Sequence, residues 1–292
     1  MRYYALARAL LFQILICNVL ATNIRSLFLF KDVLKSNTSA IKTSGFNTLI
    51  IFGVGVLENG DIMYYSNTPG STDVLIASDG AYVGGTELSD KVRSFKTDTT
   101  DVDRVEISMN AQHIKELVAS PGTGSSTRLY RNFAALKEAW GLDAVNNDDE
   151  SIYDVDSTVA FGRMLGDIGY KYTISPYINF NFWESVLAQL NSDLAEPDRL
   201  LDRIYLQCYD GGDLNDPASW QVMLSMKVVP ILWVVNNSKP VYGVTLAEAQ
   251  ELFSGWQSES SLAGGGYWND YDIEDMGSSY TDYGDVLKDV FP

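Results

Sequence analysis

Apolar runs that alternate with helical stretches are the feature of this sequence that most constrains its fold. Residues 47–56 are continuously apolar, as expected for a parallel strand that is buried on both faces. Residues 127–140 repeat apolar side chains with a helical period. Eight strand candidates recur along the chain, at 25–30, 47–56, 104–109, around 142–150, 171–175, 201–209, 228–235 and 264–268. This alternation predicts a parallel α/β architecture.

A single domain accounts for this pattern. The chain has 292 residues, of which 46% are hydrophobic and 20% charged. A (β/α)8 barrel takes roughly 250 residues, and no linker, low-complexity tract or internal repeat divides the chain. We therefore expect one (β/α)8 barrel over residues 22–292. The predicted helices cover 31–43, 84–95, 127–140, 158–168, 182–190, 246–256 and 279–290, with a hairpin arm at 61–65.

The N-terminus has the pattern of a secretory signal peptide. Arg2 and Arg8 give a basic start, residues 9–21 form a short apolar core, and Val19 and Ala21 are small enough for cleavage before residue 22. The apolar core is too short and too interrupted to span a membrane comfortably, although a signal anchor is the alternative. We therefore predict that residues 1–21 are removed and that the protein is extracellular.

The cysteine content and the glycosylation triplets are consistent with a secreted protein. Removal of the signal takes Cys17 away and leaves Cys208 as the only cysteine, so a disulfide framework is excluded. Cys208 lies in an apolar run and is expected to be a buried small side chain. Two glycosylation triplets, which begin at Asn37 and Asn236, are consistent with a secreted glycoprotein.

The charge of the chain limits its partners. The formal net charge is -17, whereas binding to phosphate backbones needs clustered Lys and Arg, so nucleic acid and anionic membrane surfaces are poor partners and we expect no binding to either. Neutral sugars remain compatible, and 17 Tyr with 6 Trp suit a sugar-stacking cleft as well as ordinary packing. His113 is the only histidine, which excludes a multi-histidine metal site. We expect no metal, no cofactor and a monomer.

An acidic run at residues 142–154 is the candidate for chemistry. A short apolar lead-in is followed by Asp148, Asp149 and Glu150, as expected for a barrel strand that delivers carboxylates to the rim where barrel active sites lie. Alternation along a strand puts Asp148 and Glu150 on one face and Asp149 on the other. Two carboxylates on one face suggest acid–base catalysis. The alternative is a solvated acidic loop.

Several stretches, in order, resemble glycoside hydrolase family 18, the chitinase-like barrels. Asp143-Ala-Val-Asn-Asn-Asp-Asp-Glu150 resembles the family's fourth-strand signature Asp-Gly-x-Asp-x-Asp-x-Glu. Ile204-Tyr-Leu-Gln-Cys-Tyr-Asp210 resembles the sixth-strand segment that ends in Tyr-Asp, and Gly264-Gly-Gly-Tyr-Trp268 resembles the eighth-strand Gly-Gly-x-x-Trp. The third-strand Ser-x-Gly-Gly is matched only in Ser108. The resemblance covers nearly all of the mature chain.

The resemblance implies a retaining mechanism in which the 2-acetamido group of the substrate is the nucleophile. It makes Glu150 the general acid and base, with Asp148 orienting the acetamido group and Tyr209 donating to its oxygen. Repulsion between the two close carboxylates is expected to raise the pKa of the proton donor. Trp268 would form the floor under the sugar, and Asp143 would support the strand end from behind. The residues predicted to bind substrate are Trp268, Asp210, Asp143, Asn146 and Gln207.

Departures from the family pattern leave two functions open. Asn146 stands where the family has a second aspartate that shares a proton with the acid pair, and an amide cannot accept that proton. Ala144 replaces a glycine, and Asn110-Ala111 replaces Gly-Gly. The first reading is a secreted, endo-acting glycosidase that cleaves β-1,4-linked N-acetylglucosamine in chitin or a related glycan, such as peptidoglycan or an N-glycan core. The alternative is a weak or inactive lectin that binds chito-oligosaccharides.

Overall fold

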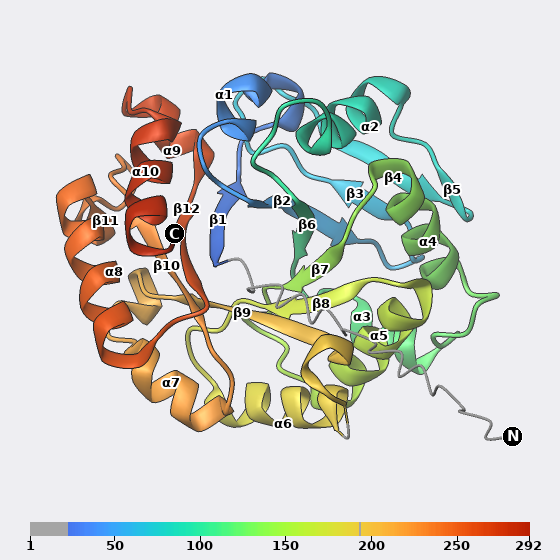
Figure 1. Ribbon diagram of the computed structural model, residues 1–292. Helices are drawn as coiled ribbons and strands as arrows, with labels where there is room; N and C mark the ends of the chain where they lie inside the picture. Colours follow the sequence, from blue (N-terminus) through green and yellow to red (C-terminus); the bar gives the residue numbers. More distant parts are fainter. Residues whose placement is uncertain (1–22, 193) are drawn as a thin grey trace, which may run out of the picture.

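Eight parallel strands close into a barrel surrounded by helices in the computed structural model (Figure 1). The structure describes residues 23–192 and 194–292, so the predicted signal peptide and Cys17 lie outside the described residues. The β1 strand pairs with β2 as well as with β12, which leaves the ring without a free edge. The predicted (β/α)8 barrel is confirmed. Its strands are β1 (Ile24–Leu29), β2 (Thr48–Val56), β6 (Arg104–Met109), β7 (Ala144–Asn147), β8 (Lys171–Ile174), β9 (Leu201–Gln207), β10 (Val229–Val234) and β12 (Gly264–Trp268).

Capping residues mark the ends of several helices. The Thr127 hydroxyl accepts from Tyr130 N at the start of α4, and Gly169 ends α5 with φ 100°, next to the predicted helix end at residue 168. Within the described residues, every helix is too short or too polar to cross a membrane. The α-helices are α1 (Thr38–Lys42), α2 (Thr86–Arg93), α3 (Ile114–Ala119), α4 (Arg128–Trp140), α5 (Val155–Ile168), α6 (Phe180–Asn191), α7 (Pro217–Leu224), α8 (Leu246–Ser260), α9 (Asp270–Asp275) and α10 (Tyr280–Val290). The 3-10 helices are η1 (Val33–Lys35), η2 (Ser94–Lys96), η3 (Glu196–Asp198), η4 (Asp210–Gly212) and η5 (Pro240–Tyr242).

The element boundaries differ from the sequence prediction in a few places. The helix predicted over residues 31–43 is split into η1 and α1, because Asp32 and Asn37 each cap a separate short helix. The β7 strand ends at Asn147, so the acidic residues lie in the loop after the strand and not within it. The helices α3, α7 and α9 were not predicted from the sequence.

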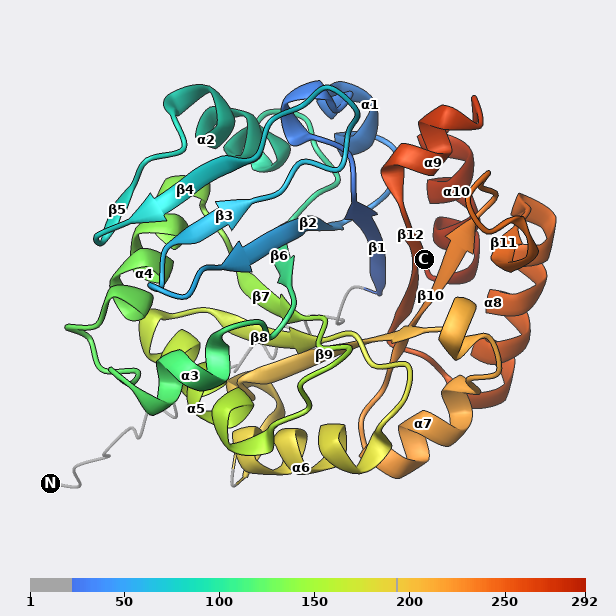
Figure 2. The same ribbon diagram turned by 180° about the vertical axis from the view of Figure 1, so that it is seen from behind.

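A small antiparallel extension continues the sheet outward from β2. The β3 strand (Ile62–Tyr64), predicted as a hairpin arm, pairs with the end of β2, and β4 (Val74–Ser78) and β5 (Ala81–Tyr82) follow it (Figure 2). The last two strands pack beside α4. A further short strand, β11 (Gly243–Val244), pairs with β10.

The inside of the barrel is apolar on one side and polar on the other. Phe28, Ile50, Tyr205, Val229 and Ile231 form one inner cluster. The inward positions of β6, β7 and β8 instead carry buried polar side chains: Glu106, Ser108, Asn146 and Thr173. A larger apolar core lies between the barrel and the helices and contains Trp183, Trp220 and Cys208, of which Cys208 was expected there from the sequence.

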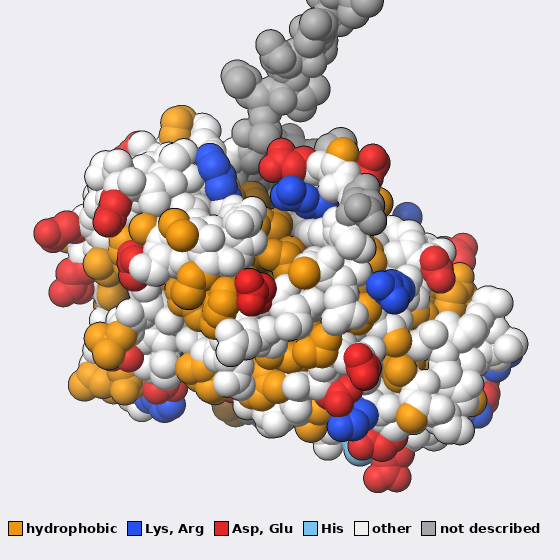
Figure 3. Space-filling view, turned by 90° about the horizontal axis from the view of Figure 1, so that it is seen from below, with side chains coloured by type: hydrophobic (Ala, Val, Ile, Leu, Met, Phe, Trp, Pro, Cys, Tyr) orange, Lys and Arg blue, Asp and Glu red, His pale blue; other side chains and the backbone are white. Residues whose placement is uncertain are grey.

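The surface carries no gathering of basic side chains on the face that Figure 3 shows. There, Lys and Arg side chains lie apart from one another, with acidic and hydrophobic side chains between them. This arrangement agrees with the net charge of -17.

Candidate active site

An open pocket of about 790 Å³ lies at the carboxyl ends of the barrel strands. This is the end of a parallel barrel at which loops from different strands bring functional side chains together. The pocket is lined by Phe28, Phe52, Asn110, Gln112, Asp148, Glu150, Ser151, Ile152, Ser175, Tyr177, Gln207, Tyr209, Asp210, Gly211, Trp233 and Trp268. Six of the predicted site residues are therefore in one pocket: Asp148, Glu150, Gln207, Tyr209, Asp210 and Trp268.

The loop after β7 places the two candidate catalytic carboxylates in this pocket. Asp148 N donates to Met109 O at 2.9 Å, which holds the loop against the end of β6. Asp148 is half-buried, whereas Glu150 is exposed and has no hydrogen-bond or ion-pair partner among the described residues. The Glu150 carboxylate is therefore free to meet a ligand.

Asp149 points away from the pocket and shapes the loop. It is buried, and its carboxylate accepts from Ser151 N, Ile152 N and Tyr153 N at 3.0, 2.8 and 2.7 Å. Such bonds from a carboxylate to backbone N–H groups fix a tight turn. The separation of Asp148 and Glu150 from Asp149 agrees with the sequence prediction, although strand alternation is not its cause. A fully solvated acidic loop, the alternative, is wrong for Asp148 and Asp149.

The electrostatics of the pocket single out Asp148. Burial, then the charge of Glu150 and then that of Asp149, raise the pKa of Asp148 to about 8. The sequence had led us to expect this rise at the proton donor, Glu150, and the structure places it at Asp148. Gln207 Nε2 donates to Asp148 Oδ1 at 3.2 Å. At neutral pH the carboxyl pair therefore retains a proton.

Aromatic side chains form the floor of the pocket. The Trp268 ring lies across Phe52 and Phe28, with ring centroids 4.8 and 5.5 Å apart, and is parallel to Tyr209 at 6.5 Å. Trp233 is buried and also lines the pocket, with its Nε1 donating to Asp272 Oδ2 at 2.8 Å. The site thus joins an apolar platform to an acidic wall.

Tyr209 and Asp210, at the end of β9, line another side of the pocket. Burial, followed by the charges of Asp148 and Glu150, raises the pKa of Tyr209 well above its usual value, so its hydroxyl stays protonated and can donate. Asp210 lies at the rim, where it forms an ion pair with Lys239. The rim acid is therefore already partly neutralised by this chain.

Two predicted substrate-binding residues do not line the pocket. Asp143 precedes β7, at the opposite end of the strand, where its Oδ2 accepts from Lys96 Nζ at 2.7 Å and Val105 N at 2.8 Å. The predicted contact of Asp143 with substrate is therefore wrong, because the length of β7 separates it from the pocket. Asn146 is completely buried inside the barrel, and Ser108 donates to its Oδ1 at 2.9 Å. It too lies beneath the pocket and not in it.

Sequence reasoning missed several pocket residues. Closure of the barrel brings Phe28 and Phe52 beside Trp268, and Tyr177 lines the same pocket. Asn110 had been noted as a departure from a Gly-Gly pair, and it lines the pocket as an exposed side chain. Among the described residues, no group of three or more His, Cys, Asp or Glu side chains is arranged to hold a metal ion.

No protein-family model and no curated protein matches this sequence. Solved structures do resemble it. A GH18 chitinase from Pseudoalteromonas aurantia superposes with a TM-score of 0.64 at 12% identity, over 91% of this chain and 99% of that one. A class V chitinase from Nicotiana tobaccum in complex with NAG4 gives 0.57 at 11% identity, over 92% and 99%. A fungal endo-beta-N-acetylglucosaminidase from glycosyl hydrolase family 18 gives 0.61 at 14% identity, over 91% and 98%. This chain therefore has the (β/α)8 fold of these glycosidases over nearly all of its described length.

Proposed function

We propose that this protein is a glycoside hydrolase of family 18 that cleaves β-1,4-linked N-acetylglucosamine by substrate-assisted retaining catalysis. One observation carries the proposal. The acid pair Asp148 and Glu150 shares a single pocket with Tyr209 and Trp268, although these residues come from three separate segments of the chain. The fold shared with chitinases and an endo-β-N-acetylglucosaminidase supports the same class of reaction.

Glu150 is the proposed general acid and base. It is exposed in the pocket and has no partner in the described chain, as a group that must reach a glycosidic oxygen requires. Asp148, two residues away, would accept the acetamido N–H and stabilise the positive charge of the oxazolinium intermediate. Because the pKa of Asp148 is about 8, the pair keeps a proton near neutral pH, and the first step needs that proton.

The remaining pocket residues would hold the sugar. The Tyr209 hydroxyl would donate to the acetamido oxygen, which brings that oxygen toward the anomeric carbon. Trp268 and its aromatic neighbours would pack under the apolar face of the ring. The 790 Å³ pocket is open, which suits an endo-acting enzyme on a polymer.

Hydrolysis of chitin oligosaccharides and of a chromogenic chitobioside tests this function. We expect the wild-type protein to release product and Glu150→Gln to lose activity by at least about a hundredfold, since general acid–base catalysis contributes that much or more. Equal rates for the two proteins would refute the proposal. Circular dichroism of both proteins checks that the variant is folded.

A chitinase-like lectin is the second candidate, and Asn146 is the observation that favours it. The Asn146 amide is fully buried, accepts hydrogen bonds from two serine hydroxyls and donates one to Thr173. It therefore does not share a proton with the acid pair as an aspartate would. In this case calorimetry would show binding of chito-oligosaccharides to the wild-type protein, without turnover. Turnover that Glu150→Gln abolishes would exclude it.

The biological setting of this function is also a proposal. We propose that residues 1–21 direct secretion and that the mature protein acts outside the cell as a monomer. Chitin is the first substrate to test, and peptidoglycan and the core of N-glycans are the other N-acetylated glycans. Mass determination of the secreted protein, together with light scattering, tests cleavage and oligomeric state.

A further inference from the structure

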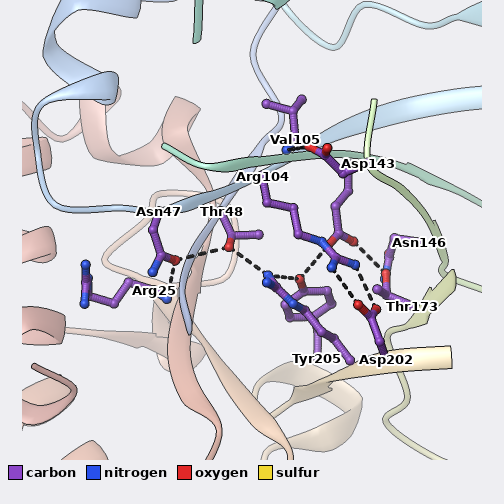
Figure 4. A network of polar contacts seen from close by, with 12 residues as sticks. Arg25, Asn47, Thr48, Arg104, Val105, Asp143, Asn146, Thr173, Asp202 and Tyr205 are labelled. Carbon is purple, nitrogen blue, oxygen red and sulfur yellow. Dashed lines mark hydrogen bonds and ion pairs between the residues drawn. The ribbon is translucent and has the colours of Figure 1, made fainter. Parts of the chain in front are cut away.

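A buried carboxylate lies inside the barrel below the pocket, on a strand that the proposed mechanism does not use. Glu106, in β6, is completely buried. Its Oε1 accepts from Arg104 Nε and Tyr205 OH, both at 2.7 Å, and its Oε2 accepts from Thr173 Oγ1 at 2.7 Å. Figure 4 shows Arg104, Tyr205 and Thr173 converging in this network. Glu106 is thus fully hydrogen-bonded.

The charge of Glu106 is balanced within the barrel. Burial disfavours the charged form of Arg104, but Glu106 and then Asp202 outweigh burial and raise the pKa of Arg104 further above its usual value. Arg104 also forms a two-pronged ion pair with Asp202 at 2.7 and 2.8 Å. A paired and hydrogen-bonded buried charge of this kind is costly to disturb, because removing one partner leaves the others unmatched.

The network requires a hydrogen-bond donor at position 146, and the Asn146 amide is a donor that does not titrate. Asn146 Oδ1 accepts from Ser108 Oγ and Ser175 Oγ, at 2.9 and 3.0 Å, and its Nδ2 donates to Thr173 Oγ1 at 3.0 Å. A threonine hydroxyl has one proton, and the proton of Thr173 goes to Glu106. The Thr173 oxygen can therefore only accept from position 146, so the carboxylate at Glu106 requires a donor there.

The same network continues to the proposed catalytic pair. Ser175, whose hydroxyl is held by Asn146, presents its backbone carbonyl to Gln207 Nε2 at 2.9 Å. Gln207 Nε2 also donates to Asp148 Oδ1 at 3.2 Å. Hydrogen-bonded residues thus connect Glu106 to Asp148 through Thr173, Asn146, Ser175 and Gln207, with the hydroxyl and the carbonyl of Ser175 joined through its own covalent frame.

We propose that Glu106 and Asn146 are a matched pair of positioning residues for Asp148. Glu106 is a buried carboxylate on the neighbouring strand that takes the Thr173 proton, and Asn146 is the complementary amide that donates to the same oxygen. The amide at position 146 is then a consequence of Glu106 and not a sign of lost activity. The role of the pair in catalysis rests on the proposed function, whereas the pairing itself does not.

Two single substitutions and their combination test the pairing. In Asn146→Asp, two carboxylates face the Thr173 hydroxyl, which has a single proton to donate. In Glu106→Gln, the amides at positions 106 and 146 both donate to the Thr173 oxygen, and the Thr173 proton has no acceptor. In the double variant the new amide at position 106 donates to Thr173, and the Thr173 proton goes to the new carboxylate at position 146. The hydrogen bonds of Thr173 are then satisfied again with their direction reversed, whereas Arg104 keeps only Asp202 as its acidic partner.

The cycle is measured by urea unfolding and by steady-state hydrolysis of chitotetraose. We expect each single variant to unfold at lower urea and to lose about tenfold in kcat with little change in KM, and the double variant to recover most of both, since coupled neighbours deviate from additivity by such amounts. A residue that acted only on overall stability would not change kcat in this way, so recovery of kcat at constant KM identifies a positioning role. If Asn146→Asp alone does not fold, folding of the double variant is itself the rescue.

Asn132 provides the matched control. It is another completely buried asparagine, in α4, whose Oδ1 accepts from Gly80 N and whose Nδ2 donates to Gly60 O, both at 2.7 Å. Asn132→Asp should lower stability, and Glu106→Gln should not rescue it. An additive cycle at positions 146 and 106, or a double variant that does not fold, would overturn the pairing. If the wild-type protein hydrolyses nothing, the proposed function fails, and the unfolding data still decide the pairing.

Discussion

Gln207 ties Asp148 to the barrel wall. Its Nε2 donates to the Asp148 carboxylate at 3.2 Å and to the Ser175 carbonyl at 2.9 Å, so both protons of the amide nitrogen are used. Asp148 is thereby held in place by a side chain from β9, two strands away from its own β7. The position of the Asp148 carboxylate is therefore fixed in part from another strand.

Substitution Gln207→Ala should weaken catalysis more than binding. Loss of a hydrogen bond to a carboxylate costs about tenfold or more, so we expect kcat on chitotetraose to fall by about that factor. Because the bond favours the ionised form of Asp148, its loss should also move the pH profile of kcat to higher pH. Gln112→Ala, an exposed residue of the same pocket, is the control and should leave the profile in place. An unchanged profile for Gln207→Ala would contradict this role.

The raised pKa of Asp148 predicts how stability depends on pH. The folded protein holds this proton up to about pH 8, whereas the unfolded chain releases it near pH 4. The folded state therefore binds more protons than the unfolded chain between these pH values. As a result, the contribution of Asp148 to the free energy of unfolding falls as the pH rises through that range. Asp148→Asn should remove this loss. Urea unfolding at pH 5 and pH 8 measures the effect, and equal pH slopes for both proteins would count against it.

Asp270 is a second carboxyl whose pKa is raised, and it serves as a comparison. Burial raises the pKa of Asp270 to about 7, although Lys31 N and Phe30 N donate to it. Asp270→Asn should therefore also reduce the fall in stability between pH 4 and pH 7. The two effects should add, because the two aspartates share no hydrogen-bond partner among the described residues.

The aromatic floor predicts a loss of affinity when Trp268 is changed. Trp268→Phe keeps a ring between Phe28 and Phe52 but removes contact area under the sugar. We expect binding of chito-oligosaccharides to weaken by about tenfold, which corresponds to about 1.4 kcal/mol. Calorimetry in the Glu150→Gln background avoids turnover. Trp256→Phe, on α8 and outside the pocket, should bind as before, and equal weakening in both variants would argue against a platform.

The two glycosylation triplets should behave differently in the folded protein. Asn37 is exposed, whereas Asn236 is buried, with its Nδ2 donating to Val234 O at 3.1 Å and its Oδ1 accepting from Lys239 N at 2.7 Å. After secretion from a eukaryotic host, we expect a glycan at Asn37 and none at Asn236. Glycopeptide mass spectrometry distinguishes them, and Asn37→Gln should abolish the mass shift. A glycan on Asn236 in folded protein would show this expectation to be wrong.

The periodicity of the sequence was sufficient to predict the barrel. Continuous apolar runs separated by helical patterns are local properties, and eight of them allow few arrangements other than a closed parallel sheet. The acidic run that ends at Glu150, and the terminal aromatic Trp268, were also readable, because residues at the carboxyl ends of barrel strands meet at one face. The short antiparallel extension after β2 was only partly predicted, since β4 and β5 are set by pairing with their neighbours.

Only the tertiary structure decided which acids share the pocket and what each one contacts. Asp143 and Glu150 lie in one sequence motif, yet the length of β7 places Asp143 at the opposite end of the barrel beside Lys96. Glu106 looked like an ordinary strand residue until closure of the barrel brought Thr173 and Tyr205 from two other strands to it. Burial and the direction of a single hydroxyl proton depend on neighbours that are distant in sequence. For that reason Asn146 was only a departure from the family pattern in the sequence, whereas in the structure it is linked to Glu106 through Thr173.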